Sequence, residues 1–297
     1  MQKWDREVDL VSIGAGVGGL AGAIATVDAG CDVLVADAPP VRVNRGSGVA
    51  TRRRVQACGW LITEAADAET ADYFAEFAAW VPGSAHVARD VPVPTRVVSA
   101  VREGEIEPFI GSRLSDWAVQ CLTSPYGMLH SRVFARGDHT MRAADGGTVE
   151  VLPIGSIGWR HGMGAPELRD WMVGQARSRG VDVLTGTPLH RLVFDDGRVV
   201  GAVFATPDGP LAVRARRGIS VAPNEHEGFT GEPLAGVGGE QRRVCLVGRT
   251  ASRFGRVEIL RTPARDADTR RPCSAVHRAL RDARNARSGP GHCRKVN

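Results

Sequence analysis

The chain has 297 residues, of which 43% are hydrophobic, and a formal net charge of +5 at neutral pH. This length and this hydrophobic fraction are enough for a sizeable core in one large domain or two ordinary ones. Most of the excess positive charge lies after Arg261, where no Phe, Trp or Tyr interrupts the arginines. The basic balance therefore describes a terminal segment, and a nucleic-acid partner is not expected.

The six cysteines form no Cys-x-x-Cys pair, which argues against a zinc or iron–sulfur site built from thiolates. Free thiols in a reducing compartment are the simpler interpretation. No apolar run is long enough to span a bilayer, and an apolar strand begins so early that no signal peptide fits before it. The sequence therefore predicts a cytoplasmic protein without a metal site or a membrane span.

The most informative segment is a glycine-rich turn near the N-terminus. An apolar strand over 8–13 runs into it, and a helix is expected over 21–29, ended by Gly30. In a dinucleotide-binding turn the first glycine permits the tight turn, the second lets the backbone approach a pyrophosphate, and the third lets the helix pack close to the sheet. Those positions are Gly14, Gly16 and Gly19. The candidate phosphate-binding residues are Gly14, Ala15, Gly16, Gly18 and Gly19.

A second strand over 31–36 ends at Asp37, whose carboxylate is suited to accept hydrogen bonds from ribose hydroxyls. A second loop, Gly46-Ser47-Gly48, could wrap the far side of a pyrophosphate or be a plain surface loop. The segment as a whole has two interpretations. It is a dinucleotide site, or it is a glycine-rich strand–helix turn that binds nothing.

The rest of the chain is expected to contain both helices and strands. An amphipathic helix is expected over 63–80, strands and loops over 82–114, and loops with short strands over 115–158. A further helix begins at Ala165 and ends near Gly180. Strands follow, separated by Asp-Gly turns that favour hairpins. They are expected over 181–184, 189–194, 199–205, 211–213 and 219–222.

Beyond Pro223 the periodicity fades. Residues 224–240 are rich in glycine, and 244–260 contain two short strands at most. Residues 261–297 are polar, rich in arginine and poor in large apolar side chains, so this tail is expected to be disordered.

Three stretches together resemble one known family. They are Val11-Ser12-Ile13-Gly14-Ala15-Gly16-Val17-Gly18-Gly19 with Asp37, then Gly162-Met163-Gly164 with Leu168, and then the run from Gly180-Val181-Asp182-Val183 through Gly186-Thr187 and Gly197-Arg198-Val199-Val200-Gly201 to Arg217-Gly218-Ile219. The order and spacing are similar to those of the flavoprotein family of fumarate reductases, succinate dehydrogenases and 3-ketosteroid dehydrogenases. The resemblance covers roughly residues 5–222, with the middle third matched loosely.

The resemblance implies an α/β fold, a Rossmann-like FAD-binding domain of the glutathione-reductase type with a β-meander. It implies FAD as cofactor, with its ADP half on Gly14, Gly16, Gly19 and Asp37. The backbone near Leu189 would lie beside the adenine, and the loop Gly46-Ser47-Gly48 would approach the pyrophosphate or the isoalloxazine.

The chain departs from the family pattern in three places. Asp37 stands where the family usually has Glu, and Ala222-Pro223-Asn224-Glu225 replaces an Ala-Thr-Gly-Gly turn. The part after Glu225 is also shorter than the family's substrate domain, so the second region is expected to be incomplete. The predicted division is an FAD-binding domain over 1–225, with a loosely matched insertion over 70–158, a remnant of the substrate or cap region over 226–260, and the tail over 261–297.

The function implied is an FAD-dependent oxidoreductase that transfers hydride between a small organic substrate and the flavin. The catalytic residues are not identified. Arg160 and His161, just before Gly162, are candidates for facing a bound flavin, with solvated loop residues as the alternative. A shortened, non-catalytic relative that binds FAD weakly or not at all is the second hypothesis, and the oligomeric state stays open.

Overall fold

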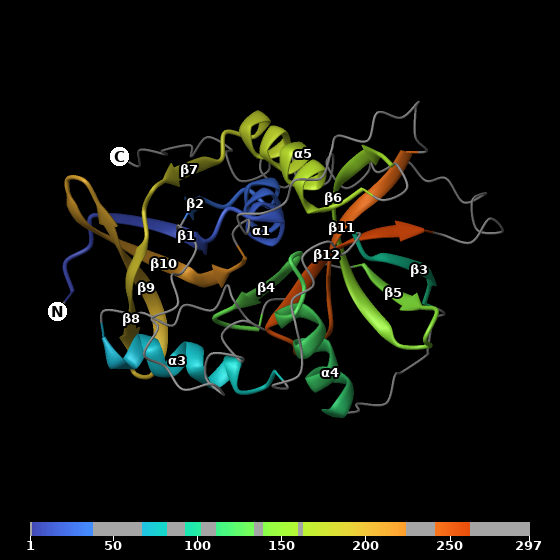
Figure 1. Cartoon of the computed structure of the whole chain (residues 1–297), viewed down its shortest axis with the longest axis horizontal. Coiled ribbons are helices and arrows are strands. Elements are labelled where there is room, and N and C mark those ends of the chain that lie inside the picture. Colours follow the sequence, from blue (N-terminus) through green and yellow to red (C-terminus); the bar gives the residue numbers. More distant parts are fainter. Residues whose placement is uncertain are drawn as a thin grey trace, which may run out of the picture. The chain divides into compact units, whose positions relative to one another are not determined.

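The computed structural model describes residues 2–37, 67–81, 93–101, 111–133, 139–159, 163–223 and 241–261. These residues form a mixed α/β structure (Figure 1). The helices are α1 (Val17–Asp28), α3 (Ala68–Ala78), α4 (Gly111–Leu122) and α5 (Ala165–Ser178). The strands are β1 (Arg6–Ile13), β2 (Val33–Asp37), β3 (Thr95–Ala100), β4 (Gly127–His130), β5 (Thr140–Ala143), β6 (Thr148–Gly158), β7 (Asp182–Thr185), β8 (Leu189–Asp195), β9 (Arg198–Thr206), β10 (Gly209–Val221), β11 (Gln241–Gly248) and β12 (Phe254–Arg261).

A parallel sheet carries the glycine-rich turn. Its strands lie in the order β10–β1–β2–β7, and β1 is paired on both edges. The connection from β1 through α1 to β2 is the βαβ unit that the sequence predicts. Helix α1 begins at Val17, earlier than the expected Ala21, because the carbonyl of Gly16 already accepts the N–H of Leu20 at 3.0 Å. Gly30, two residues after the end of the helix, has a φ of +74°, as expected of a helix-ending glycine.

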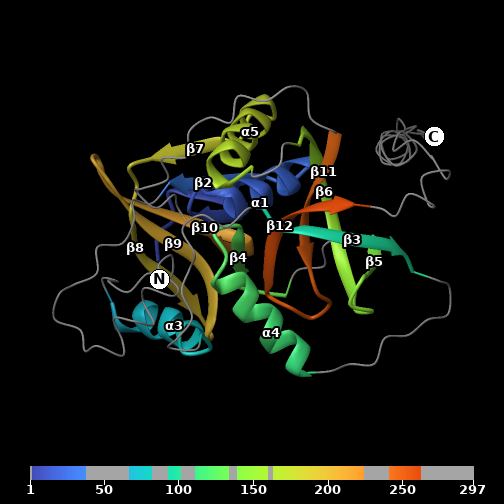
Figure 2. The same cartoon turned by 45° about the vertical axis from the view of Figure 1, so that its right-hand side comes forward.

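The side chains of β1 divide the core into two parts. Leu10 packs in one cluster with α1 and α5, whereas Val11 and Ile13 pack on the opposite face with the strands of the meander. This alternation follows from the period of two along a strand. Figures 1 and 2 show α1 and α5 together on one side of the parallel sheet, with α3 below β8 and β9 on the other. Helix α3 is tied there by Thr70 Oγ1, which accepts the N–H of Leu192 at 2.9 Å.

The predicted meander is present as β8, β9 and β10. Asp196 and Gly197 form the first hairpin turn with φ angles of +49° and +69°, the conformation that an Asp-Gly turn favours. Strand β10 differs from expectation, because the separate strands over 211–213 and 219–222 are one continuous strand. Its first half pairs with β9 and its second half with β1, so hydrogen bonds support the backbone along its whole length.

Five strands outside the parallel sheet close into a ring, in which β11, β6, β5, β3 and β12 are each paired with the next and β12 pairs again with β11. Strand β4 pairs with both β12 and β10 and so joins the ring to the parallel sheet. The two strands expected within 244–260 are therefore confirmed as β11 and β12, although each is longer than predicted. The assignment of 226–260 to a cap remnant stays a prediction.

Helix α4 contradicts the expectation of strands and loops over 82–114 and of loops with short strands over 115–158. Its apolar residues Trp117, Ala118, Cys121 and Leu122 are buried, and they recur at the helical spacing of three and four. A helix with one buried stripe is stable where it can cover a core, and α4 covers β4 and β12. Helix α3, by contrast, confirms the helix expected over 63–80 within its described part.

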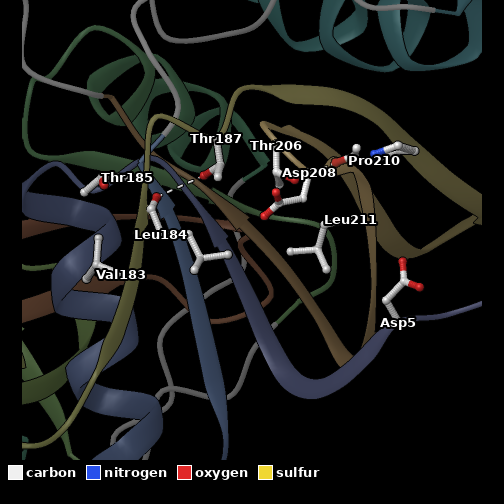
Figure 3. A pocket seen from close by; sticks show the side chains of 10 residues that line it. Asp5, Val183, Leu184, Thr185, Thr187, Thr206, Asp208, Pro210 and Leu211 are labelled. Atoms are coloured by element: carbon white, nitrogen blue, oxygen red, sulfur yellow. Dashed lines mark hydrogen bonds between the residues drawn. The ribbon is translucent and has the colours of Figure 1, made fainter.

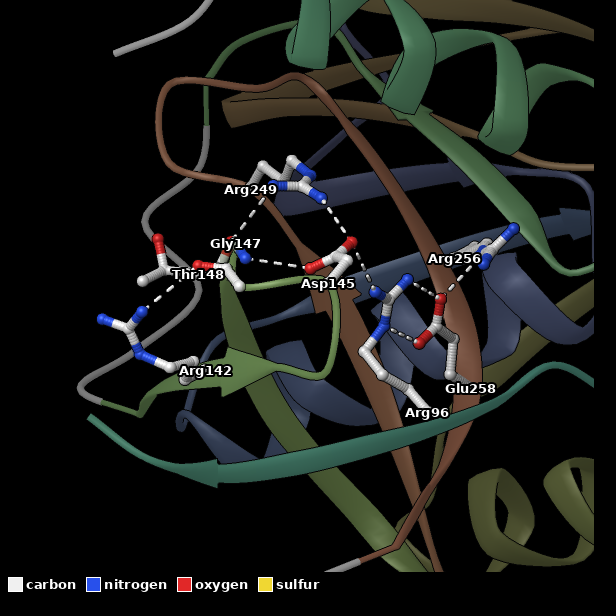
Figure 4. Close-up of polar contacts among 9 residues, drawn as sticks. Arg96, Arg142, Asp145, Gly147, Thr148, Arg249, Arg256 and Glu258 are labelled. Carbon is white, nitrogen blue, oxygen red and sulfur yellow. Dashed lines mark hydrogen bonds and ion pairs between the residues drawn. The ribbon is translucent and has the colours of Figure 1, made fainter. Parts of the chain in front are cut away.

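A buried carboxylate lies at the ring (Figure 4). Glu258 of β12 is fully buried, and Arg96 donates to both of its oxygens at 2.5 and 2.9 Å. Arg256 donates to the same carboxylate at 2.6 Å. The guanidinium groups of Arg96, Arg256 and Arg249 lie over the ring of Trp117, at 5.7, 5.2 and 5.8 Å from its centroid. Charge pairing and cation–π contacts therefore join β3, β12 and α4 at one place.

Candidate nucleotide site

The candidate site lies at the carboxyl ends of the parallel strands. There Gly14 donates its N–H to the carbonyl of Ala36 at 2.8 Å, and Ala222 donates to the carbonyl of Ile13 at 2.9 Å. The ends of β10, β1 and β2 are therefore held side by side, with the glycine-rich turn in the middle. In open α/β sheets this edge, beside a helix N-terminus, is where ligands bind.

The structure assigns a distinct geometric role to three of the candidate glycines. Gly14 has a φ of +99°, a conformation that side chains disfavour, and it makes the sharp exit from β1. A Cβ on Gly19 would lie 2.0 Å from the carbonyl oxygen of Gly14, so only glycine lets α1 start this close to the strand. A Cβ on Gly18 would lie 2.4 Å from the carbonyl oxygen of Gly127, because β4 runs directly against the first turn of α1.

Gly16 is different. It is the N-cap residue of α1 with φ −71° and ψ −178°, angles that any residue adopts. Backbone conformation therefore does not require glycine at this position. The N-cap residue itself has no side chain that could cap the helix. The first N–H groups of a helix have no partner within that helix, so the start of α1 is suited to an anion. The close approach of a phosphate is the role predicted for Gly16.

Helix α5 runs alongside α1 with its own N-terminus at the same edge. Near the N-terminal ends of both helices, Arg169 Nε donates to the carbonyl oxygen of Ala15 at 3.4 Å. Near their C-terminal ends, Arg179 Nε pairs with Asp28 Oδ1 at 2.8 Å. The two helices are therefore parallel, and both direct the positive ends of their dipoles towards the glycine-rich turn.

Asp37 is the acidic residue of the candidate site and lies at the carboxyl end of β2. It pairs in register with Thr185, the last residue of β7. Burial raises the pKa of the Asp37 carboxyl above its usual value, and the positive charge of Arg169 opposes that rise. A partly desolvated carboxylate at the end of a strand is suited to accept hydrogen bonds from a hydroxyl-rich group such as ribose.

The sequence does not point to Arg169, and it offers Tyr126 no partner at a spacing that would assign it a role. Arg169 follows the buried Leu168, so it lies at the border of the buried stripe of α5, and only the packing of α5 on α1 brings it to the turn. The ring of Tyr126 is fully buried in one cluster with Ala15, Val17 and other residues near the turn. Burial, with a contribution from the charge of Glu167, raises the pKa of its hydroxyl.

Several predicted site residues lie outside the described residues, and they stay predictions. They are Gly46, Ser47 and Gly48 of the second loop and the catalytic candidates Arg160 and His161. Leu189 is described. It begins β8 with its side chain buried in the core on the meander side, and a contact between its backbone and an adenine also stays a prediction.

A separate pocket of about 590 Å³ opens between β7 and the β9–β10 hairpin (Figure 3). Two of its three threonine hydroxyls donate hydrogen bonds to the backbone. Thr187 donates to the carbonyl of Leu184 at 2.9 Å, and Thr206 donates to that of Gly209 at 2.6 Å. One of its carboxylates, Asp5, accepts the N–H of Ala212 at 2.9 Å. These polar groups stabilise turns and strand ends, and the glycine-rich turn takes no part in the lining.

Other kinds of site find little support in the part of the chain that the structure covers. Among those residues no group of three His, Cys, Asp or Glu side chains is placed to hold a metal ion, and no helix combines the length and apolar character needed to cross a membrane. Cys31 and Cys245 are free thiols. Burial raises the pKa of Cys245 to about 12, so this thiol is unreactive.

Comparison with known proteins gives similarity only at the level of solved structures. No protein-family model and no curated protein sequence matches the chain. A 3-ketosteroid-Δ4-(5α)-dehydrogenase from Rhodococcus jostii RHA1 is 22% identical with a TM-score of 0.30, over 74% of this chain and 46% of that one. A flavocytochrome c3 fumarate reductase is 18% identical with a TM-score of 0.29, over 71% and 33%. A myxobacterial FAD-dependent chondrochloren halogenase is 14% identical with a TM-score of 0.31, over 93% and 58%.

The chain thus spans less than two thirds of the length of each of these three structures. At this level of similarity no residue role is transferred from them. The site is described from its own geometry.

Proposed function

We propose that this chain binds FAD through the turn between β1 and α1 and acts as a flavin-dependent oxidoreductase. The observation that carries the proposal is the turn itself. It combines Gly14 at positive φ, Gly19 in contact with the turn, the N-terminus of α1 at Gly16 and Asp37 at the end of the next strand. Each of these features suits one part of an adenosine diphosphate group.

The meander favours FAD over a nicotinamide dinucleotide. After β7 the chain forms β8 and β9 and returns through β10 to a position beside β1. This arrangement is typical of the flavoprotein family that the sequence resembles. When bound, FAD supplies hydride transfer, and the protein supplies orientation and exclusion of water. The substrate is proposed to be a small organic molecule, and the group that moves its proton is not assigned.

Purification of the full chain tests the proposal. We expect a yellow protein with a flavin absorbance band, or a colourless one that takes up FAD in preference to NADH in an equilibrium titration. Gly16→Trp is expected to abolish this binding while the far-UV spectrum stays that of the wild type. A folded wild-type protein that binds no flavin contradicts the proposal.

A second candidate is a non-catalytic relative that binds FAD weakly or not at all. The burial of the turn favours it, since Ala15 and Val17 are each 3% exposed and pack in one cluster with Tyr126 and Met163. A ligand at the turn has to displace part of this packing. Reduction of the bound flavin by candidate substrates separates the two candidates, because a non-catalytic relative keeps its flavin oxidised with every substrate.

A further inference from the structure

Arg169 is the positively charged side chain that links the two halves of the candidate site. It comes from α5, yet its Nε contacts the carbonyl of Ala15 inside the glycine-rich turn. Its charge also acts on Asp37 at the end of β2. In an adenosine diphosphate bound here, the phosphates would lie at the turn and the ribose at Asp37. A cation that acts on both places is therefore close to the negatively charged phosphates.

We propose that Arg169 binds the diphosphate of the nucleotide and thereby makes the site selective for a diphosphate-bearing ligand over a nucleoside. This inference rests on the proposed function and adds a specificity-determining residue to it. The bond from Nε to the carbonyl of Ala15 places the planar guanidinium at the glycine-rich turn, beside the start of α1. Charge-assisted, bidentate contacts of this kind are what arginine offers to phosphate.

A purely structural role is the competing explanation, because Arg169 also ties α5 to the turn. Arg179 provides a matched control for that role. It ties the same two helices through Asp28, but at their opposite ends, away from the carboxyl edge of the sheet. Both arginines are partly buried on α5. Loss of either one removes a positive charge and a link between α1 and α5, and Arg179 lies at the end of the helices away from the candidate site.

The test compares the full-length wild type with Arg169→Gln, Arg169→Lys and Arg179→Gln. Dissociation constants are measured for FAD and ADP by titration, and for adenosine by competition, at low and at high salt. Arg169→Gln is expected to weaken FAD and ADP by about tenfold to a hundredfold and to leave adenosine unchanged. It also reduces the salt dependence of ADP binding. Arg169→Lys restores part of the affinity, since the charge stays while the fork is lost. Arg179→Gln binds all three ligands as the wild type does.

Equal weakening of ADP and adenosine in Arg169→Gln would assign Arg169 a structural role and overturn the inference. Unchanged ADP binding in that variant overturns it as well, while the proposed function survives as long as the wild type binds FAD. If the wild type binds neither FAD nor ADP, the proposed function fails, and the inference fails with it.

Discussion

At the scale of single residues, the glycines of the turn are not equivalent. The positive φ of Gly14 and the close contact of Gly19 are properties of the fold, needed whether or not a ligand binds. Gly16 has ordinary backbone angles at the N-cap of α1, so its backbone conformation gives no reason for glycine, and a ligand role is what we propose for it. The sequence motif contains all three glycines without showing this difference, because φ and the distance to a neighbouring carbonyl exist only in the folded chain.

Substitution by alanine separates the two roles. Gly19→Ala is expected to lower the free energy of unfolding by about 2 kcal/mol or more, since its Cβ would overlap the Gly14 carbonyl. Gly16→Ala is expected to lower it by less than about 1 kcal/mol and to weaken FAD binding by at least about tenfold, or ~1.4 kcal/mol. Urea unfolding and flavin titration measure the two effects. A Gly16→Ala protein with wild-type FAD affinity would falsify the ligand role.

Replacement of Asp37 by asparagine is expected to weaken FAD binding but to stabilise the ligand-free protein. The Asp37 carboxylate is expected to accept ribose hydrogen bonds, so Asp37→Asn weakens FAD by about tenfold to a hundredfold at neutral pH. The affinity of the wild type for FAD falls on acidification as Asp37 becomes protonated. Because burial raises the pKa of Asp37, this fall begins at a higher pH than it would for an aspartate with an ordinary pKa. The variant shows no such decline. Titrations between pH 4 and pH 8 measure this difference.

The same substitution is expected to stabilise the ligand-free protein. A carboxyl whose pKa is raised by folding contributes most to stability when it is protonated, and that contribution is lost as the pH rises through the folded-state pKa. Asp37→Asn therefore has a higher melting temperature than the wild type at neutral pH, and the difference shrinks in acid. A lower melting temperature at pH 7 speaks against burial as the dominant influence on this carboxyl.

At the scale of elements, the decisive contacts join segments that are far apart in the sequence. Helix α5 meets α1 at Arg169 and at Arg179, and β12 meets β3 through Glu258 and Arg96. The helical spacing of Trp117, Ala118, Cys121 and Leu122 was visible in the sequence, so α4 was predictable although it was not predicted. The ring of β3, β5, β6, β11 and β12 was not predictable in this way, since local periodicity does not specify which strands pair.

Removal of the Glu258 carboxylate tests how much this buried group stabilises the ring of five strands. Glu258→Ala leaves Arg96 and Arg256 without their partner in a buried setting and is expected to cost about 3 kcal/mol or more of unfolding free energy. Asp182→Ala is the control, because its pair with Arg6 is 2.9 Å long and exposed on both sides. That change is expected to cost about 0.5 kcal/mol. Chemical denaturation measures both, and equal effects would argue that the buried cluster contributes no more than a surface pair.

At the scale of the whole molecule, the described residues up to Arg261 are joined by one continuous set of strand pairings, from the ring through β4 and β10 to the parallel sheet. At the amino-terminal edge of that sheet, Arg216 of β10 donates to Asp9 of β1 at 2.9 Å and to Asp32 at 3.2 Å. Charge pairs therefore stabilise the edge opposite the candidate nucleotide site.

Acid sensitivity follows from that edge. The hydrogen bond from Arg216 and that from the backbone of Asp32 lower the pKa of Asp9 to about 2. A carboxyl with a lowered pKa stabilises the fold above its unfolded-state value, and this contribution is lost as the pH falls from about 4 towards 2. Asp9→Asn is therefore less stable than the wild type at pH 6, and the two converge near pH 2. Denaturant midpoints at several pH values measure the difference, and parallel curves without convergence would contradict this assignment.

The sequence by itself determined the local features of this protein: the strand–turn–helix unit with Gly14 and Gly19, the acid at the end of the second strand, and the meander with its Asp-Gly turns. These follow from the period of side-chain burial and from backbone preferences, which act between near neighbours. Only the tertiary structure decided that Arg169 meets the turn, that the backbone angles of Gly16 do not require glycine, and that β11 and β12 complete a ring. Those outcomes depend on which distant segments pack together, and the free energy of that packing is not encoded in any single stretch of the chain.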